Sequence, residues 1–171
     1  MLLSFNKLKV LIFITSFFFF ICAPIFAIDQ EEALFYSEWL DTVSDNSLKL
    51  SKAYIDENPS KALSFLSEAI NNSDNKDLKA KCYLQSGIIY NFSFLHKSES
   101  AIEYLNLAKE IYIEINDVKK LLFTNLIIGE VHRKNGEEEK AKKTYETAYN
   151  RAKEINSSYF TFLAYLSKID L

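Results

Sequence analysis

Glycine, proline, cysteine and histidine are all scarce in this chain of 171 residues, which has three glycines, two prolines, two cysteines and two histidines. An all-β domain of many short strands needs many turns, and turns depend heavily on glycine and proline. The composition therefore argues against such a fold. Because 49% of the residues are hydrophobic, the chain has ample apolar surface for a packed core. The sequence predicts an all-α protein.

Residues that commonly carry chemistry are few. After Ala27 the only cysteine is Cys82, which excludes an internal disulfide and a cysteine-rich zinc site in that part of the chain. The two histidines, His96 and His132, have no metal-ligating residues at a useful spacing. We expect His96 at the surface, in an extended turn from Phe92 to Lys97, and His132 in a core or half-buried position. No glycine-rich phosphate loop, nucleophile elbow or metalloprotease motif is present. We therefore expect no catalytic residues, no metal, no cofactor and no enzymatic activity.

Clustered positive charge is also lacking. Residues 28–171 carry 18 basic and 23 acidic side chains, a formal charge of −5, because the segment before them holds two lysines and no acids. Proteins that bind nucleic acids neutralise phosphates with clustered lysine and arginine. The charge balance therefore predicts no nucleic-acid partner.

Residues 1–27 form a separate segment. Lys7 and Lys9 are its only charges, and Val10 to Ile21 is an apolar run with the length of the hydrophobic region of a signal peptide. The segment ends in Ala-Pro-Ile-Phe-Ala, so residues 1–27 are predicted to be a signal peptide cut after Ala27. The alternative is an uncleaved N-terminal anchor, because the apolar stretch is nearly long enough to span a bilayer. Either way residues 28–171 are expected to be exported, periplasmic or secreted.

A recurring set of small residues organises the rest of the chain. Each set has a small residue, a large apolar residue four positions later and a small residue three positions after that, a spacing that places all three on one helix face. The sets recur at a nearly constant interval, and they are Ala62, Leu66 and Ala69; Ala101, Leu105 and Ala108; and Ala141, Tyr145 and Ala148. We interpret the recurrence as three similar structural units.

Each set is expected in the second helix of a pair. Gly87 and Gly129 lie in the preceding segments, where a glycine would let two helix backbones approach closely and would leave a gap for Tyr145 to fill. Polar breaks between the apolar segments predict helix ends and new caps. These breaks are Asn116-Asp117, Asn135-Gly136 and Asn156-Ser157-Ser158. A cap helix beginning at Asp29, a helix over residues 46–58 and a new helix opening at Pro59 are predicted in the same way.

This arrangement resembles the tetratricopeptide repeat, whose hallmark is a small residue in the first helix and an Ala, aromatic, Ala set in the second. The resemblance covers residues 44–156, with Leu50 where the first glycine would fall. A period of about 40 residues is similar to the long-helix variants of that family and also fits HEAT-like repeats. The resemblance implies a right-handed superhelical solenoid of antiparallel helix pairs over residues 28–171. It would have about three repeats, one extra helix at each end and a concave face lined by the first helices.

The concave face is the first candidate site for a peptide or protein partner. By resemblance, residues near the marker glycines point into this groove, and they are Lys81, Leu84, Ile88, Asn91 and Phe92 in the second unit and Phe123, Leu126, Glu130, Arg133 and Lys134 in the third. Asn91 and Arg133 each lie four residues after a glycine and suit recognition of a peptide backbone or carboxylate. The alternative is that several of these residues pack between helices and that the charged ones form a solvated face.

The C-terminal segment is the second candidate site. Residues 158–170 predict a further first helix that is apolar on nearly all sides, although a capping helix should have a polar outer face. The apolar residues expected to interact are Phe160, Phe162, Leu163, Tyr165 and Leu166. Either this helix binds another chain, self-association included, or the polypeptide is a short relative or a fragment of a longer repeat protein.

These observations predict a non-catalytic scaffold for protein–protein interaction, exported to the periplasm or cell exterior. Its partner would bind in the concave groove or on the apolar C-terminal helix, and a membrane would be a partner only if the N-terminal segment is not cut. The alternative is the sensor region of a bacterial membrane signalling regulator that contains tetratricopeptide repeats. An enzyme is the least favoured of the three classes.

Overall fold

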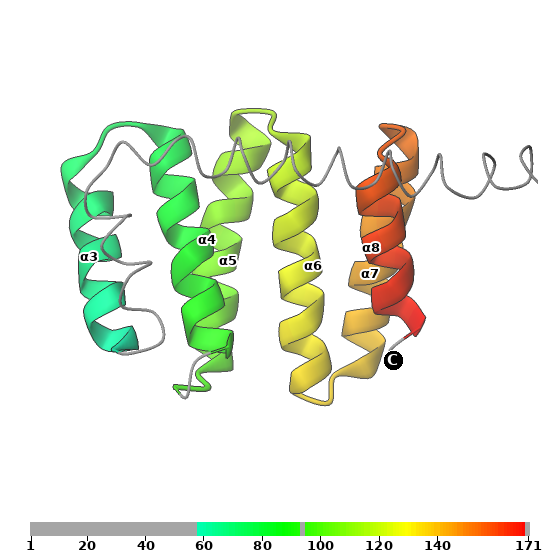
Figure 1. Ribbon diagram of the computed structural model, residues 1–171, viewed down its shortest axis with the longest axis horizontal. Helices are drawn as coiled ribbons and strands as arrows, with labels where there is room; N and C mark the ends of the chain where they lie inside the picture. Colours follow the sequence, from blue (N-terminus) through cyan, green and yellow to red (C-terminus); the bar gives the residue numbers. More distant parts are fainter. Residues whose placement is uncertain (1–57, 93–94, 170–171) are drawn as a thin grey trace, which may run out of the picture.

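The computed structural model describes residues 58–92 and 95–169, and all regular secondary structure in this part of the chain is helical (Figure 1). The helices are α3 (Pro59–Asn72), α4 (Lys76–Phe92), α5 (Ser98–Glu114), α6 (Val118–Lys134), α7 (Glu138–Glu154) and α8 (Ser158–Ile169). The prediction of an all-α fold is thereby confirmed for the described residues. The expected signal peptide, the helix beginning at Asp29 and the helix expected before Pro59 lie outside them.

Polar caps begin four of these helices. Asn58 accepts a hydrogen bond from the backbone N–H of Lys61 at 3.0 Å, and Pro59 occupies the first helical turn of α3. Asn75, Asp117 and Ser157 accept corresponding bonds at the starts of α4, α6 and α8. Each cap satisfies one backbone N–H that has no partner within its own helix. The predicted helix opening at Pro59 is therefore confirmed, as are the new caps predicted within Asn116-Asp117 and Asn156-Ser157-Ser158.

The turns between helices recur at a regular interval. His96, Asn116, Gly136 and Asn156 have φ values of 41°, 56°, 71° and 54°, in the left-handed region that glycine and asparagine tolerate best. At the last three, the next backbone N–H donates to a carbonyl oxygen five residues earlier, at 2.9 to 3.0 Å. This bond closes the end of a helix around a left-handed residue. Helices of 17 residues joined by three-residue turns result for α5, α6 and α7.

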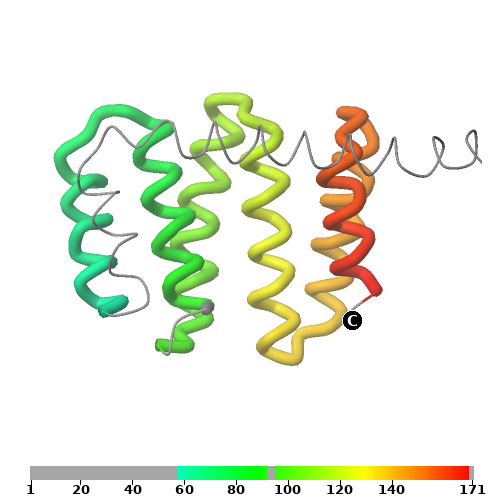
Figure 2. Tube along the Cα trace, viewed as in Figure 1, coloured from blue at the N-terminus to red at the C-terminus, as the bar shows by residue number. Residues whose placement is uncertain are grey.

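The helices form two layers. Figure 1 shows α4, α6 and α8 side by side, with α5 behind α4 and α7 behind α8, and Figure 2 follows the chain as it alternates between the layers. Each helix packs against the next one in sequence, and α6 also contacts α4 and α8. We call α4, α6 and α8 the front helices.

The three recurrent sets occupy matching places in this array. In each set all three side chains are at most 2% exposed, and each set belongs to its own hydrophobic cluster. The first cluster packs α3 against α4, the second packs α4, α5 and α6, and the third packs α6, α7 and α8. The sets therefore mark the contacts between successive helices, as their spacing predicts.

Two glycines permit the closest of these contacts. A Cβ atom at Gly87 would lie 2.6 Å from Cγ of Leu105, and one at Gly129 would lie still closer to Cε1 of Tyr145. Both separations are too short for real atoms, so Leu105 and Tyr145 occupy space that any other residue would take. The prediction that Tyr145 fills the gap left by Gly129 is confirmed.

Candidate functional site

The predicted groove residues divide into buried and accessible ones. Leu84 and Leu126 belong to the packing clusters, which corrects the expectation that they face a groove and agrees with the packing alternative. Lys81 and Asn91 are also buried, and the side-chain amide nitrogen of Asn91 finds no hydrogen-bond partner among the described residues. Phe92 ends α4, and its side chain lies outside what the structure describes. Resemblance alone did not fix the rotation of these helices closely enough to separate core from groove.

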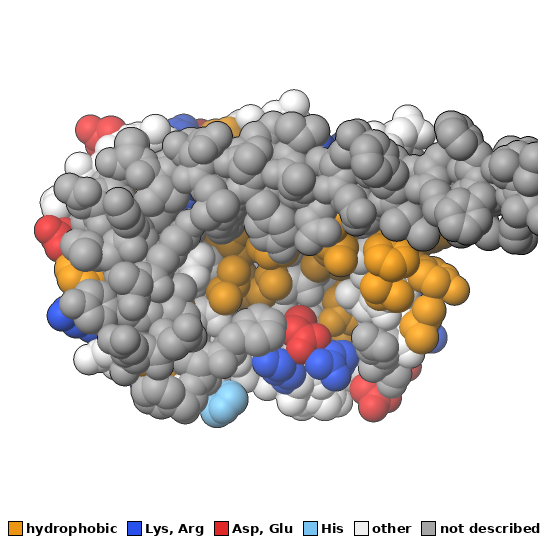
Figure 3. Space-filling model, viewed as in Figure 1, with side chains coloured by type: hydrophobic (Ala, Val, Ile, Leu, Met, Phe, Trp, Pro, Cys, Tyr) orange, Lys and Arg blue, Asp and Glu red, His pale blue; other side chains and the backbone are white. Residues whose placement is uncertain are grey.

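The accessible members of this set come mainly from α6. Ile88 and Phe123 are half-buried, Glu130 is half-buried, and Arg133 and Lys134 are exposed. Figure 3 shows hydrophobic side chains between α4 and α6 and around α8, with acidic and basic side chains near the lower end of α6. The part of this face in view therefore combines apolar side chains with charged ones at the lower end of α6.

Arg133 is already engaged by its own helix. Its Nε and Nη2 atoms each donate to a carboxylate oxygen of Glu130 at 2.7 Å, and the Tyr145 hydroxyl lies 3.4 Å from the same carboxylate. The hydrogen bonds from Arg133 hold the pKa of Glu130 below its usual value. Burial raises the pKa of Tyr145 to about 12, so its hydroxyl stays protonated and available as a donor. A carboxylate ligand at Arg133 would compete with Glu130.

A cluster of charges that sequence reasoning missed joins the starts of α4 and α6. Lys120 lies 2.5 Å from Asp117 and 3.1 Å from Asp77, and Asp77 lies 2.6 Å from the buried ammonium group of Lys81. Burial opposes the ionisation of Asp77, but hydrogen bonds from Lys81 and Lys120 outweigh it and hold its pKa below the usual value. The i, i+4 spacing of Asp77 and Lys81 was the available signal. Their mutual pairing shows that the cluster serves the contact between the two helices.

Helix α8 presents apolar side chains on two sides. Phe160 is buried in the third cluster and Leu163 packs against it, whereas Phe162, Tyr165 and Leu166 are 43%, 52% and 40% exposed. Ile169, at the end of the helix, is 60% exposed. The five predicted residues of α8 therefore fall into two buried or half-buried ones and three exposed ones, and Ile169 adds a fourth to the exposed side.

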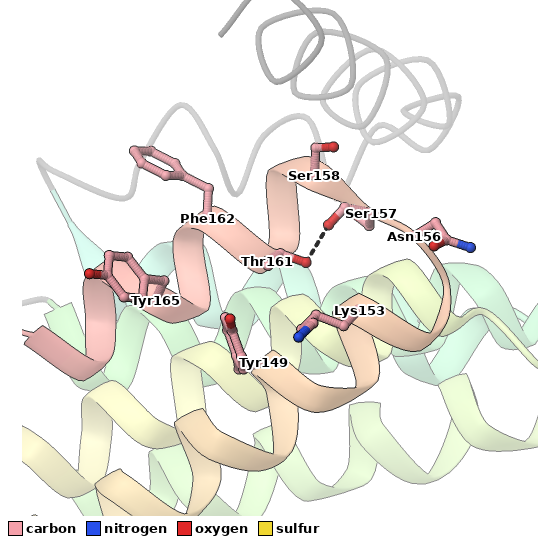
Figure 4. Close-up of a pocket in the computed structure, with 8 residues that line it drawn as sticks. All are labelled: Tyr149, Lys153, Asn156, Ser157, Ser158, Thr161, Phe162 and Tyr165. Carbon is pink, nitrogen blue, oxygen red and sulfur yellow. Dashed lines mark hydrogen bonds between the residues drawn. The ribbon is translucent and has the colours of Figure 1, made fainter. Parts of the chain in front are cut away.

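A pocket of about 600 Å³ lies between α7 and α8. Tyr149 and Lys153 line it from α7, Thr161, Phe162 and Tyr165 line it from α8, and the turn at residues 156–158 closes one end (Figure 4). The Thr161 hydroxyl donates to the Ser157 carbonyl oxygen at 2.6 Å, which fixes this turn. Tyr149 and Lys153 were not predicted, although their i, i+4 spacing beside the Ala148 and Ala152 seam placed them on a common face.

A second groove, of about 490 Å³, lies over α3, α4 and α5. Three tyrosines are among the residues that line it, with Tyr104 5.4 Å from Tyr90 and 6.1 Å from Tyr83 between ring centroids. These distances are typical of aromatic rings that pack against each other. The tyrosines thus stabilise the junction of α4 with α5 as well as lining the groove.

The two histidines occupy the positions expected from the sequence. His96 is exposed in the turn before α5, and the half-buried His132 lies 2.5 Å from a carboxylate oxygen of Glu137. Among the described residues no group of three or more His, Cys, Asp or Glu side chains is placed to hold a metal ion. Among the described residues, neither histidine pairs with one of the predicted groove residues.

Comparison with known proteins gives no assignment, since no protein-family model and no curated protein matches the chain. Across residues 58–92 and 95–169, no helix combines the length and the hydropathy that crossing a bilayer would require.

Proposed function

We propose that this protein is a tetratricopeptide-like helical scaffold that binds a protein or peptide partner through its front helices, above all through α8. The observation that carries the proposal is the exposed apolar side of α8, where Phe162, Tyr165 and Leu166 are 40% to 52% accessible on a helix that is otherwise well packed. Contiguous apolar surface of this kind marks an interaction site.

Two further features support a repeat scaffold. Three matched contacts between helices and turns at regular intervals are what a right-handed superhelical solenoid of antiparallel helix pairs would need. In such an array the front helices line one continuous surface. The charged pair of Glu130 and Arg133 then lies at the edge of that surface and would orient an incoming chain.

We further propose that residues 1–27 direct export of this scaffold to the periplasm or cell exterior, and that its role is non-catalytic. Lys7 and Lys9 before an apolar run support the first part. Fusion of residues 1–27 to a phosphatase that is active only outside the cytoplasm tests it directly. Phosphatase activity should appear with the native segment and disappear when an aspartate pair interrupts the apolar run.

Site-specific photo-crosslinking tests the interaction. A photoreactive amino acid replaces Tyr165 on α8 in the full chain, and a matched chain carries it at Asn106, an exposed position on α5. We expect a discrete crosslinked product from position 165 in living cells and none from position 106. Equal labelling from the two positions, or no product from position 165, would refute binding through α8.

A further inference from the structure

The three front helices carry the same apolar stripe at corresponding positions. The segment Glu-Ile-Asn precedes both α6 and α8, at residues 114–116 and 154–156, and the asparagine is left-handed in both places. When these two segments are aligned, the first residue of α8 corresponds to the first residue of α6. Aligning Gly87 with Gly129 gives the corresponding positions of α4 and α6. The corresponding stripes are Ala80, Leu84 and Gly87 in α4; Leu122, Leu126 and Gly129 in α6; and Phe162, Leu166 and Ile169 in α8.

In α4 and α6 this stripe is covered by the next helix. Leu122 and Leu126 are 1% and 8% exposed and share a cluster with Ala141 and Tyr145 of α7. Ala80 and Leu84 are fully buried and share a cluster with residues of α5. On α8 the corresponding side chains of Phe162, Leu166 and Ile169 are 43%, 40% and 60% exposed. The face that receives a helix on α4 and α6 is therefore uncovered on α8.

The pocket beside α8 extends the same face. Helix α7 packs on α6 and covers its stripe. The pocket between α7 and α8 borders the matching stripe of α8, because Phe162 belongs both to the pocket and to the stripe. Tyr149 and Lys153 supply the other wall from α7 (Figure 4). The uncovered stripe of α8 is therefore continuous with this pocket through Phe162.

The last position of the stripe determines which helix fits. In α4 and α6 this position is glycine, which leaves room for Leu105 and for Tyr145. In α8 it is Ile169, whose larger side chain leaves less room at this position. A helix that packs on α8 in the same way must therefore carry a small residue where α5 has leucine and α7 has tyrosine.

We propose that this face of α8 binds one amphipathic α-helix of a partner protein, in the position that α7 occupies on α6. The bound helix carries alanine, glycine or serine at three successive seam positions, spaced four and then three residues apart. This inference rests on the proposed interaction through α8 and adds the kind of partner. Among the described helices of a second copy, α3, α5 and α7 do not fit, because they have leucine or tyrosine at the middle seam position and bury their seams against their own neighbours.

Two synthetic peptides test the proposal against the full chain by fluorescence anisotropy. One has the α7 sequence, residues 138–154, and the other is the same peptide with Tyr145→Ala. We expect the alanine peptide to bind at least about tenfold more tightly, since Ile169 leaves no room for the tyrosine ring. In the Ile169→Gly chain the preference should reverse, because the glycine restores the gap present at Gly129.

Two variants distinguish specific binding at this face of α8 from nonspecific binding to exposed apolar side chains. Leu166→Asp should weaken binding of the alanine peptide at least about tenfold, as a charge placed in an apolar contact does. Leu107→Asp, at an exposed apolar position on α5, should leave binding unchanged. Far-UV circular dichroism confirms that each variant keeps its helical content.

The proposal is overturned if neither peptide binds, if the preference does not reverse with Ile169→Gly, or if Leu166→Asp binds as the parent does. It is also overturned if sedimentation shows a dimer that Leu166→Asp dissociates, because a second copy would then cover the face. Crosslinking from position 165 in cells distinguishes failure of the proposed scaffold function from failure of the proposed choice of partner helix. If crosslinks form while the peptide preference is absent, the scaffold function stands and only the choice of helix is wrong.

Discussion

Helices α6 and α8 carry the same pattern in the same register, yet one is core and the other is surface. Leu122 and Leu126 of α6 are buried, and Phe162 and Leu166 of α8 at the corresponding positions are about two-fifths exposed. The difference lies in α7, which covers α6, whereas no described helix takes that position on α8. An apolar stripe becomes core only where a neighbour supplies the opposite face.

The largest expected contrast is between two tyrosines. Tyr145→Ala should lower the free energy of unfolding by about 3 to 5 kcal/mol, because it empties the gap over Gly129 in a packed core. Tyr165→Ala should change it by less than about 0.5 kcal/mol, since that residue is about half exposed and belongs to no packed cluster. Urea unfolding followed by circular dichroism measures both. Comparable losses for the two variants would show that α8 is not an open surface.

The next contrast compares equivalent leucines. Leu126→Ala should cost about 2 to 4 kcal/mol through lost burial and the cavity that remains. Leu166→Ala should cost less than about 1 kcal/mol, because less apolar area leaves contact with the protein. The same urea titration measures them. A large loss at Leu166 in the isolated protein would contradict the exposure on which the comparison depends.

A smaller contrast concerns the third stripe position. Gly129→Ala should destabilise the fold by about 1 to 2 kcal/mol, because the new Cβ meets the Tyr145 ring and this clash exceeds the gain in helix propensity. Ile169→Ala should be within about 0.5 kcal/mol of the parent. Combining Gly129→Ala with Tyr145→Leu should show coupling between the two sites in a double-mutant cycle. Additive effects would mean that residues 129 and 145 do not share the contact.

A contrast of similar size compares two ion pairs. Asp77→Asn should cost about 1 to 2 kcal/mol, because this carboxylate bridges the buried Lys81 of α4 and Lys120 of α6. Glu146→Gln, which removes a 3.6 Å pair with Lys168 on α8, should cost less than about 0.5 kcal/mol, as exposed pairs do. Thermal unfolding at two salt concentrations checks both, and a larger loss for Glu146→Gln would invert the ranking.

The Asp77 effect should also depend on pH. A carboxyl whose pKa is lowered in the folded state stabilises the fold above its unfolded pKa of about 3.9, and this contribution is lost as pH falls through the folded value. The difference between parent and Asp77→Asn should be steady near neutrality and should shrink below about pH 4. If the difference instead grows on acidification, the ionised form of Asp77 does not stabilise the folded state.

Some features of this arrangement could be predicted from local sequence patterns. The 4-then-3 spacing predicted the Ala141, Tyr145 and Ala148 seam, and Gly129 predicted the gap, because helix periodicity is local and does not depend on distant residues. The polar breaks between the helices were visible for the same reason. The residues that line the groove were harder to predict from the sequence. Leu84 and Leu126 were expected to face it and instead pack between helices, because a small rotation of a helix exchanges core and groove.

Local sequence by itself determined where the helices begin, where they end and which side chains form each seam. Only the tertiary structure decided that Asp77 and Lys120 meet across two helices, that Arg133 is held by Glu130, and that the stripe of α6 is closed while that of α8 is open. The physical reason is that periodicity fixes which face of a helix is apolar. Whether water or another helix meets that face depends on a neighbour that lies elsewhere in the chain or in another molecule.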